Sequence, residues 1–109
     1  MTTYAPVAVT MNGVAATYNA AAAGDKVSGA GDNTWITVKN GSGSPITLTI
    51  TPTGNTGYGV ALPVKTWSIA ATGEMDIPIL AAYANPSDSS LVTLAWSSTT
   101  TVTWAAKRI

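Results

Sequence analysis

The chain has 109 residues, enough for one domain, and it contains no Cys and no His. These absences exclude disulfides, thiolate metal sites and the commonest general base, and the lack of Cys fits folding in a reducing cytosol. The five Lys and Arg residues balance five Asp and Glu, and charged residues make up 9% of the chain. Without a basic face to hold phosphates, we expect no nucleic-acid partner.

Low charge combined with 46% apolar residues has two explanations. The surface is either neutral and rich in Thr, Ser and Gly, or much of it is buried against other subunits. The start of the chain has neither a basic region nor a continuous apolar run, and no apolar stretch is long enough to span a bilayer. We therefore expect neither a secretory signal nor a membrane partner.

Apolar residues alternate in the segment 1–13, which carries Val7, Val9 and Met11 after a proline. This alternation predicts a short strand that begins where the missing proline N–H costs least. The segment is either an edge strand or an N-terminal arm that lies across a neighbouring subunit. On the second interpretation its candidate contact residues include Tyr4 as well as the three alternating side chains.

Residues 14–19 also alternate and predict a strand, whereas 24–34 read as a loop. Asp25, Asp32 and Asn33 stand among glycines there and superficially resemble a calcium loop. Their spacing does not match an EF-hand, and no bidentate Glu follows. Turn chemistry explains them better, so we expect no metal and no cofactor.

The clearest element consists of two β-rich runs, 35–39 and 46–51, on either side of a Gly/Ser/Asn loop. This pattern predicts a β-hairpin. In the second run Ile46, Leu48 and Ile50 alternate with threonines, so one face is buried. The run is uncharged and free of proline, and it would be an aggregation hazard if exposed. We therefore expect it to be a central strand.

Two aromatic residues fall outside the apolar register. Trp35 shares its face with Thr37 and Lys39, so it is exposed, covered by the N-terminal segment, or buried against another subunit. Tyr58 lies in a Gly-rich loop and either meets a partner or covers the end of the core. Aromatic residues are enriched in interface cores, so both are candidate subunit contacts.

The second half of the chain predicts further strands. Short strands are expected at 60–64, 65–70, 74–80, 91–97 and 101–107, with a tight turn at 71–73 and a second hairpin formed by the last two strands. Pro78 indicates an edge strand or a bulge, and the outward-pointing Glu74 and Asp76 on the same strand discourage unwanted pairing. About eight short antiparallel strands and no credible helix predict an all-β, single-domain β-sandwich or jelly roll over residues 1–109.

Catalytic residues are not evident in the sequence. Glu74 and Asp76 are the only close carboxylate pair, and they share a strand face with Cα atoms about 6.5–7 Å apart. A glycosidase pair can have that spacing, but such a pair normally lies in a cleft rather than on an edge strand. No histidine can activate a Ser or Thr nucleophile. We expect the protein not to be an enzyme.

A carbohydrate-binding module is the alternative that the four Trp residues suggest. Trp67, Trp96 and Trp104 fall on the apolar register and are expected in the core. A sugar platform needs two or three coplanar aromatic rings, which leaves Trp35 and Tyr58.

The chain resembles the small decoration (head-accessory) proteins on the capsids of tailed double-stranded DNA bacteriophages. The resemblance rests on three stretches and covers about residues 34–109. These are Trp-Ile-Thr-Val-Lys-Asn-Gly-Ser-Gly-Ser-Pro-Ile-Thr-Leu-Thr-Ile at 35–50, Ser-Ile-Ala-Ala-Thr-Gly-Glu-Met-Asp-Ile-Pro-Ile at 68–79, and the closing pair Val-Thr-Leu-Ala-Trp at 92–96 with Val-Thr-Trp-Ala-Ala-Lys-Arg-Ile at 102–109.

The resemblance implies a β-sandwich on the outside of the virion capsid that bridges subunits of the major capsid protein. It also implies a homo-oligomer, with a trimer favoured. The basic-then-apolar end, Arg108 and Ile109, joins the candidate contacts on this basis. The composition agrees nearly as well with a phage tail or fibre component.

Overall fold

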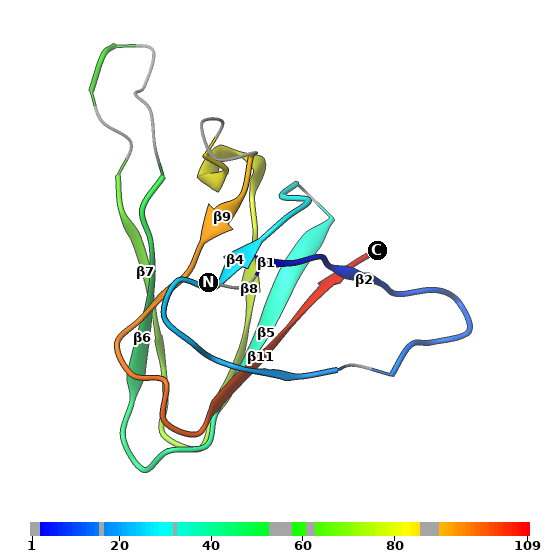
Figure 1. The fold of residues 1–109 in the computed structure, drawn as a ribbon, viewed down its shortest axis with the longest axis vertical. Helices are drawn as coiled ribbons and strands as arrows, with labels where there is room; N and C mark the ends of the chain where they lie inside the picture. The colour runs from blue at the N-terminus through cyan, green and yellow to red at the C-terminus, as the bar shows by residue number, and fades with distance from the viewer. Residues whose placement is uncertain (1–2, 16, 32, 53–57, 61–62, 86–89) are drawn as a thin grey trace.

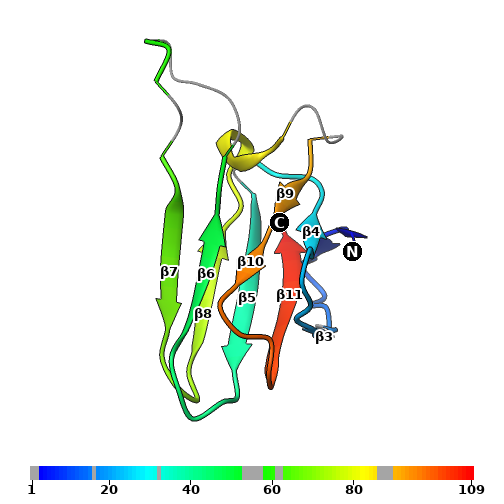
Figure 2. The same ribbon diagram turned by 60° about the vertical axis from the view of Figure 1, so that its left-hand side comes forward.

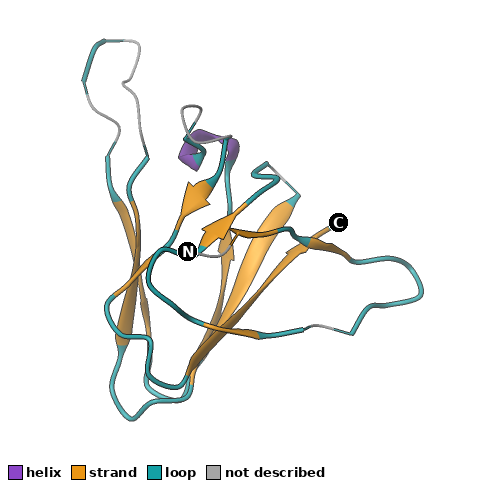
Figure 3. Cartoon of the chain, viewed as in Figure 1, coloured by secondary structure: helices purple, strands orange, loops and turns teal. Residues whose placement is uncertain are grey.

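Eleven strands and one 3-10 helix make up the regular structure in the computed structural model, which describes residues 3–15, 17–31, 33–52, 58–60, 63–85 and 90–109 (Figures 1 and 3). The strands are β1 (Thr3–Tyr4), β2 (Val7–Ala8), β3 (Asn19–Ala20), β4 (Lys26–Val27), β5 (Thr34–Asn40), β6 (Ile46–Ile50), β7 (Lys65–Ile69), β8 (Glu74–Pro78), β9 (Val92–Thr93), β10 (Ala95–Trp96) and β11 (Val102–Arg108), and the helix is η1 (Ala81–Tyr83).

The strands form two layers. The large sheet has the order β2-β11-β5-β8, and β3 also pairs with β11. The opposite layer consists of the small sheet, β10-β6-β7, and the upper sheet, β1-β4-β9. The small and upper sheets are linked because β10 follows β9 directly after Leu94. The Leu94 N–H donates to the Asp25 carbonyl (2.8 Å). Figure 2 shows β7 and β6 along one side of the molecule and β11 along the other. The predicted all-β sandwich is confirmed.

The core lies between the layers and follows the predicted alternation. Side chains on a strand point alternately to the two faces, and one face of each long strand is buried. The largest fully buried side chains come from both layers: Val27, Ile36, Val38, Ile46, Leu48, Ile50, Ile69, Ile77, Ile79, Val92, Leu94 and Trp104. Trp67 and Trp96, which were also predicted to point inward, are half-buried and pack against this core.

Both predicted hairpins are wrong. Strand β5 pairs with β11 and β8, whereas β6 pairs with β7 and β10. The loop between β5 and β6 therefore carries the chain from the large sheet to the small sheet. The connection from β10 to β11 also crosses between the layers. Alternation identifies the buried face of a strand but not its neighbour, which is why adjacent runs were mistaken for pairs.

Asn40 fixes the corner at which β5 leaves the large sheet. Its side-chain N–H groups donate to the carbonyl oxygens of Ser44 (2.8 Å), Ile69 and Ala70 (both 3.2 Å). Its side-chain oxygen accepts from the N–H (3.0 Å) and hydroxyl (2.6 Å) of Ser42. A single buried amide thus joins the corner loop to the end of β7.

Other details differ from the sequence-based expectations. The described residues form eleven strands instead of about eight, because several are only two residues long. Two pairings, β1 with β4 and β2 with β11, are parallel rather than antiparallel. The predicted strand 91–97 is divided at Leu94. The described parts of 14–19 and 60–64 are not in strands, apart from Asn19, which begins β3, and η1 was not expected.

Two positional predictions are confirmed. Strand β6 is central in the small sheet, and β8 is an edge strand of the large sheet. The segment 1–13 contributes two strands, β1 and β2, and each lies at the edge of its sheet.

Candidate functional site

The solvent-facing side of the large sheet, called the outer face below, carries four charged side chains and two aromatic residues, Trp35 and Tyr18. Residues opposite one another on neighbouring strands share a face, so the strand register defines rows across it. The three rows are Pro78-Trp35-Lys107-Val7, Asp76-Thr37-Ala105 and Glu74-Lys39-Thr103. The outer face therefore combines acidic residues on β8 with basic residues on β5 and β11.

Trp35 and Val7, two predicted contact residues, lie in the same row. Trp35 is half-buried between its cross-strand neighbours Pro78 and Lys107. Val7 is exposed and pairs with Lys107 from the other side. The register thus brings residues 28 positions apart in the sequence onto one line of the outer face.

Tyr18 is a residue of this face that sequence reasoning missed. Its ring centroid lies 4.1 Å from the Lys39 Nζ and 5.6 Å from the Lys107 Nζ. Tyr18 directly precedes β3, which pairs with β11, whereas Lys39 lies on β5 at the other side of β11. The ring therefore reaches across β11, where Ala105 is buried. Cation–π attraction holds the N-terminal segment over this part of the sheet. The signal in the sequence was a lone aromatic residue in an Ala-rich stretch.

Charge is distributed unequally between the two outer surfaces. Four of the ten charged residues of the chain lie in the rows of the outer face: Lys39, Glu74, Asp76 and Lys107. The Thr37 hydroxyl donates to Asp76 Oδ1 (2.5 Å). The solvent-facing side of the small sheet carries only small uncharged side chains at its paired positions: Thr47, Thr49, Thr66, Ser68 and Ala95.

The remaining predicted contacts near the termini have different environments. Tyr4 is half-buried and meets Trp104 edge to face, with ring centroids 4.8 Å apart, so it covers part of the core. The Val9 N–H donates to the Arg108 carbonyl (2.7 Å). Arg108 and Ile109 are exposed and line a cleft of about 570 Å³ beside the N-terminal segment.

The other two predicted contacts lie on connections that project from the body of the molecule. Met11, on the β2–β3 connection, is 99% exposed. Tyr58, in the β6–β7 connection, is 95% exposed, and Val60 beside it is 63% exposed. In Figure 1 the described residues 58–60 and the described part of the β2–β3 connection lie on opposite sides of the molecule. The structure therefore does not bring Met11 and Tyr58 together.

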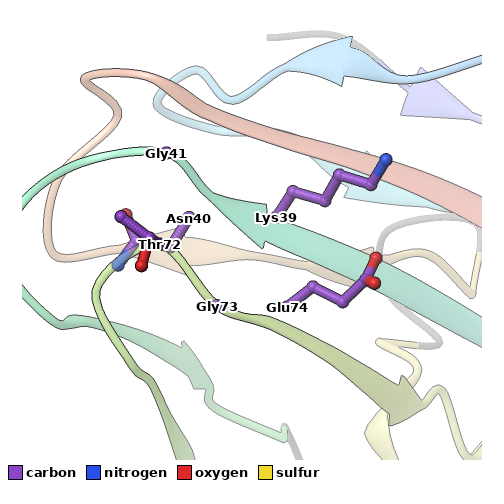
Figure 4. A pocket seen from close by; sticks show the side chains of 6 residues that line it. All are labelled: Lys39, Asn40, Gly41, Thr72, Gly73 and Glu74. Atoms are coloured by element: carbon purple, nitrogen blue, oxygen red, sulfur yellow. The ribbon is translucent and has the colours of Figure 1, made fainter.

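A shallow pocket of about 340 Å³ lies at the corner end of the outer face, between β5 and the turn before β8 (Figure 4). Lys39 and Glu74, on neighbouring strands, are its only charged lining residues. Glu74 and Asp76 are both exposed on the edge strand β8, as predicted. This arrangement can make polar contacts with a partner, but it offers no enclosed space in which two carboxylates converge on a substrate.

In the ranges that the structure describes, no group of three or more His, Cys, Asp or Glu side chains could hold a metal ion. Asp32, one of the residues weighed for calcium binding, lies outside them. No helix in the described ranges is long and apolar enough to cross a membrane.

Asp25 is the second feature that sequence reasoning missed. It was interpreted as a turn residue, but its side chain is fully buried. Its Oδ2 accepts from the indole N–H of Trp104 (3.1 Å), the indole N–H of Trp96 (3.4 Å) and the Ala22 N–H (2.8 Å). Buried indole N–H groups require an acceptor, which is the signal that could have indicated this carboxylate.

Comparisons with known proteins give no relationship: no protein-family model, no curated protein and no solved structure matches the chain.

Proposed function

We propose that the chain is a structural virion protein, most specifically a capsid decoration protein. It binds the outside of a tailed-phage head across subunits of the major capsid protein and stabilises the shell. It is made in the host cytoplasm, acts as a homo-oligomer with a trimer favoured, is not an enzyme, and binds no nucleic acid or membrane. The proposal rests on the resemblance of residues 34–109 and on the surface described above.

The observation that carries the proposal is the exposure of large apolar side chains on both projecting connections. Met11 and Tyr58 are almost fully exposed, and Val60 and Val64 are exposed as well. Apolar side chains at the ends of projections lose contact with water when a second protein covers them. Two such projections from a body 21 Å thick suit a protein that reaches from one subunit of a shell to the next.

Many copies on one shell make modest contacts effective. A protein that binds only the expanded lattice stabilises that lattice by mass action. When each copy touches more than one subunit, the contacts act together and the effective concentration of the second contact is high. The chemistry required is apolar and polar surface contact, which the outer face and the two projections supply.

The direct test mixes the purified chain with expanded, undecorated capsids of the parent phage. We expect saturable binding at stoichiometric copy number and greater resistance of the capsids to heat and chelators. The absence of binding, with no change in capsid stability, would contradict the proposal.

A substitution at Met11 tests whether the β2–β3 connection contacts the capsid. Met11→Ser should leave the fold unchanged, since the side chain touches little of its own chain, and should weaken capsid binding. Burying a methionine contributes about 1.5–3 kcal/mol, which corresponds to roughly tenfold or more in Kd. Thr99→Ala, an exposed position in the connection before β11, is the matched control and should bind like the unmodified chain. Equal binding by both variants would remove Met11 from the interface.

A carbohydrate- or host-surface-binding module is the second candidate, and one observation favours it. Trp35 and Tyr18 flank Lys107 on the outer face, which places two aromatic residues near one cation. Titration of glycans with tryptophan fluorescence, after screening on a glycan array, should show quenching that Trp35→Ala reduces. If no glycan changes the fluorescence of the unmodified chain, this candidate is excluded.

A further inference from the structure

We propose that β7 is a self-association edge, at which a second copy of this chain adds its own β7 in antiparallel pairing. Among the strands that the structure describes, β7 is the last of the small sheet and pairs with β6 alone. Figure 2 shows it at the outer margin of its layer. An edge strand presents a row of backbone N–H and C=O groups that can template another strand.

The two described edge strands of five residues, β7 and β8, differ in how they are protected against pairing with a strand of another molecule. Strand β8, at the edge of the large sheet, carries Glu74, Asp76 and Pro78 within five residues. Charges and proline are the devices that prevent edge pairing. Strand β7 has the sequence Lys-Thr-Trp-Ser-Ile, with one charge at its first position and no proline. Among the described edge strands of five or more residues, β7 thus carries a single charge at its end, whereas β8 carries two charges and a proline.

The sequence of β7 is self-complementary about its central residue. A two-fold axis at Trp67 places the two Trp67 side chains opposite each other. The same register sets Thr66 of each copy against Ser68 of the other and Lys65 against Ile69. Aromatic pairs and hydroxyl pairs opposite one another stabilise neighbouring strands, and this register opposes no like charges. The partner that fits this edge best is therefore a second copy.

Trp67 gives a further reason for the pairing. Its side chain lies on the core-facing side, in register with Leu48, yet it is only half-buried because the layer ends there. Tyr83 covers part of it, with ring centroids 6.0 Å apart, and the Lys65 Nζ lies 5.9 Å from its ring. A second β7 would continue the sheet past Trp67 and remove more of the indole from water.

The solvent-facing side of the small sheet does not oppose this extension. Its paired positions carry Thr, Ser and Ala, with no charge. The joined sheets would thus present one continuous neutral surface of six strands. This contact is two-fold, so it is separate from the trimer favoured above, and its test uses the isolated chain without capsids.

The test measures mass by analytical ultracentrifugation over a range of concentrations. We expect the unmodified chain to approach twice the 11.0 kDa of one copy as concentration rises. The double variant Thr66→Lys and Ser68→Lys places lysines directly opposite each other twice per interface, and it should weaken association by roughly tenfold or more. Mixing it with the variant that has Glu at both positions should restore the pair.

Two controls separate edge pairing from other contacts. Thr47→Lys with Thr49→Lys adds the same charges to the same side of the small sheet, but on the central strand β6, and should still dimerise. Because the chain has no cysteine, mixing Thr66→Cys with Ser68→Cys should form an intermolecular disulfide, whereas each variant alone should not. A monomeric unmodified chain, or a dimer that the β7 lysines leave intact, would overturn the proposal.

Discussion

Asp25 is a buried carboxylate whose two oxygens have different surroundings. Oδ2 accepts three hydrogen bonds, including one from the fully buried Trp104, whereas Oδ1 is buried without a partner. The indole groups come from β10 and β11, in opposite layers of the sandwich. The carboxylate therefore ties both layers to the segment that leads into β4.

The position allows a graded test at the residue scale. Asp25→Ala leaves the buried Trp104 indole N–H without an acceptor, and a buried unpaired group costs about 1–3 kcal/mol. Asp25→Asn keeps an oxygen that can accept from this donor, so it should destabilise less. Urea unfolding should rank the free energies of unfolding as unmodified, then Asn, then Ala.

Glu74→Ala is the control for Asp25, because this carboxylate is exposed on the edge strand β8. Its effect on the free energy of unfolding should stay within about 0.5 kcal/mol. An alanine at position 25 that is as stable as the unmodified chain would show that the indole bonds contribute nothing net.

At the scale of the elements, the corner at Asn40 replaces the turn of a hairpin. The backbone N–H of Asn40 donates to the Gly73 carbonyl (2.8 Å), and the backbone N–H of Gly41 donates to the Thr101 carbonyl (2.9 Å). A Cβ at Gly41 would lie 2.9 Å from the same Thr101 oxygen, so only glycine allows the two backbones to approach this closely. All three crossings between the large and small sheets meet at this end of the molecule.

Asn40→Ala should therefore destabilise the sandwich more than an ordinary surface change. It removes the side-chain partners of Ser42 and of the carbonyls at the end of β7, and we expect a loss of about 2–3 kcal/mol. Asn12→Ala, at an exposed turn, is the matched control and should change stability by less than about 0.5 kcal/mol. Thermal unfolding followed by circular dichroism measures both, and equal melting temperatures would contradict the role given to Asn40.

The sequence predicted the faces of strands better than their partners. Ile46, Leu48 and Ile50 are buried as expected, because a two-residue period directly reports which side meets the core. The partners of β5 were missed because β8 and β11 follow it by tens of residues, and pairing over such distances leaves no local pattern. For the candidate site, the alternation identified Trp35 as an outward residue. It could not place Lys107 and Val7 in the same row, because that row depends on the distant pairing of β11 with β5 and β2.

At the scale of the whole molecule, charge and shape point to surface contact. The net charge is zero, and four of the ten charged residues lie in the rows of the outer face of the large sheet. The solvent-facing paired positions of the small sheet are uncharged, and so are the exposed residues Met11, Tyr58 and Val60. A protein of this kind has little electrostatic repulsion between its own copies, which favours both the capsid contact and the β7 pairing proposed above.

The position of β11 has a consequence for how the protein is made. This strand pairs with β2, β3 and β5, which lie in the first 40 residues, and it is built from residues 102–108. The large sheet cannot close while the ribosome has yet to add those residues. Until then β5 lacks one of its two neighbours, and its apolar face is exposed. Folding dominated by such distant pairings is slow, so newly made chains depend on prompt completion to avoid aggregation.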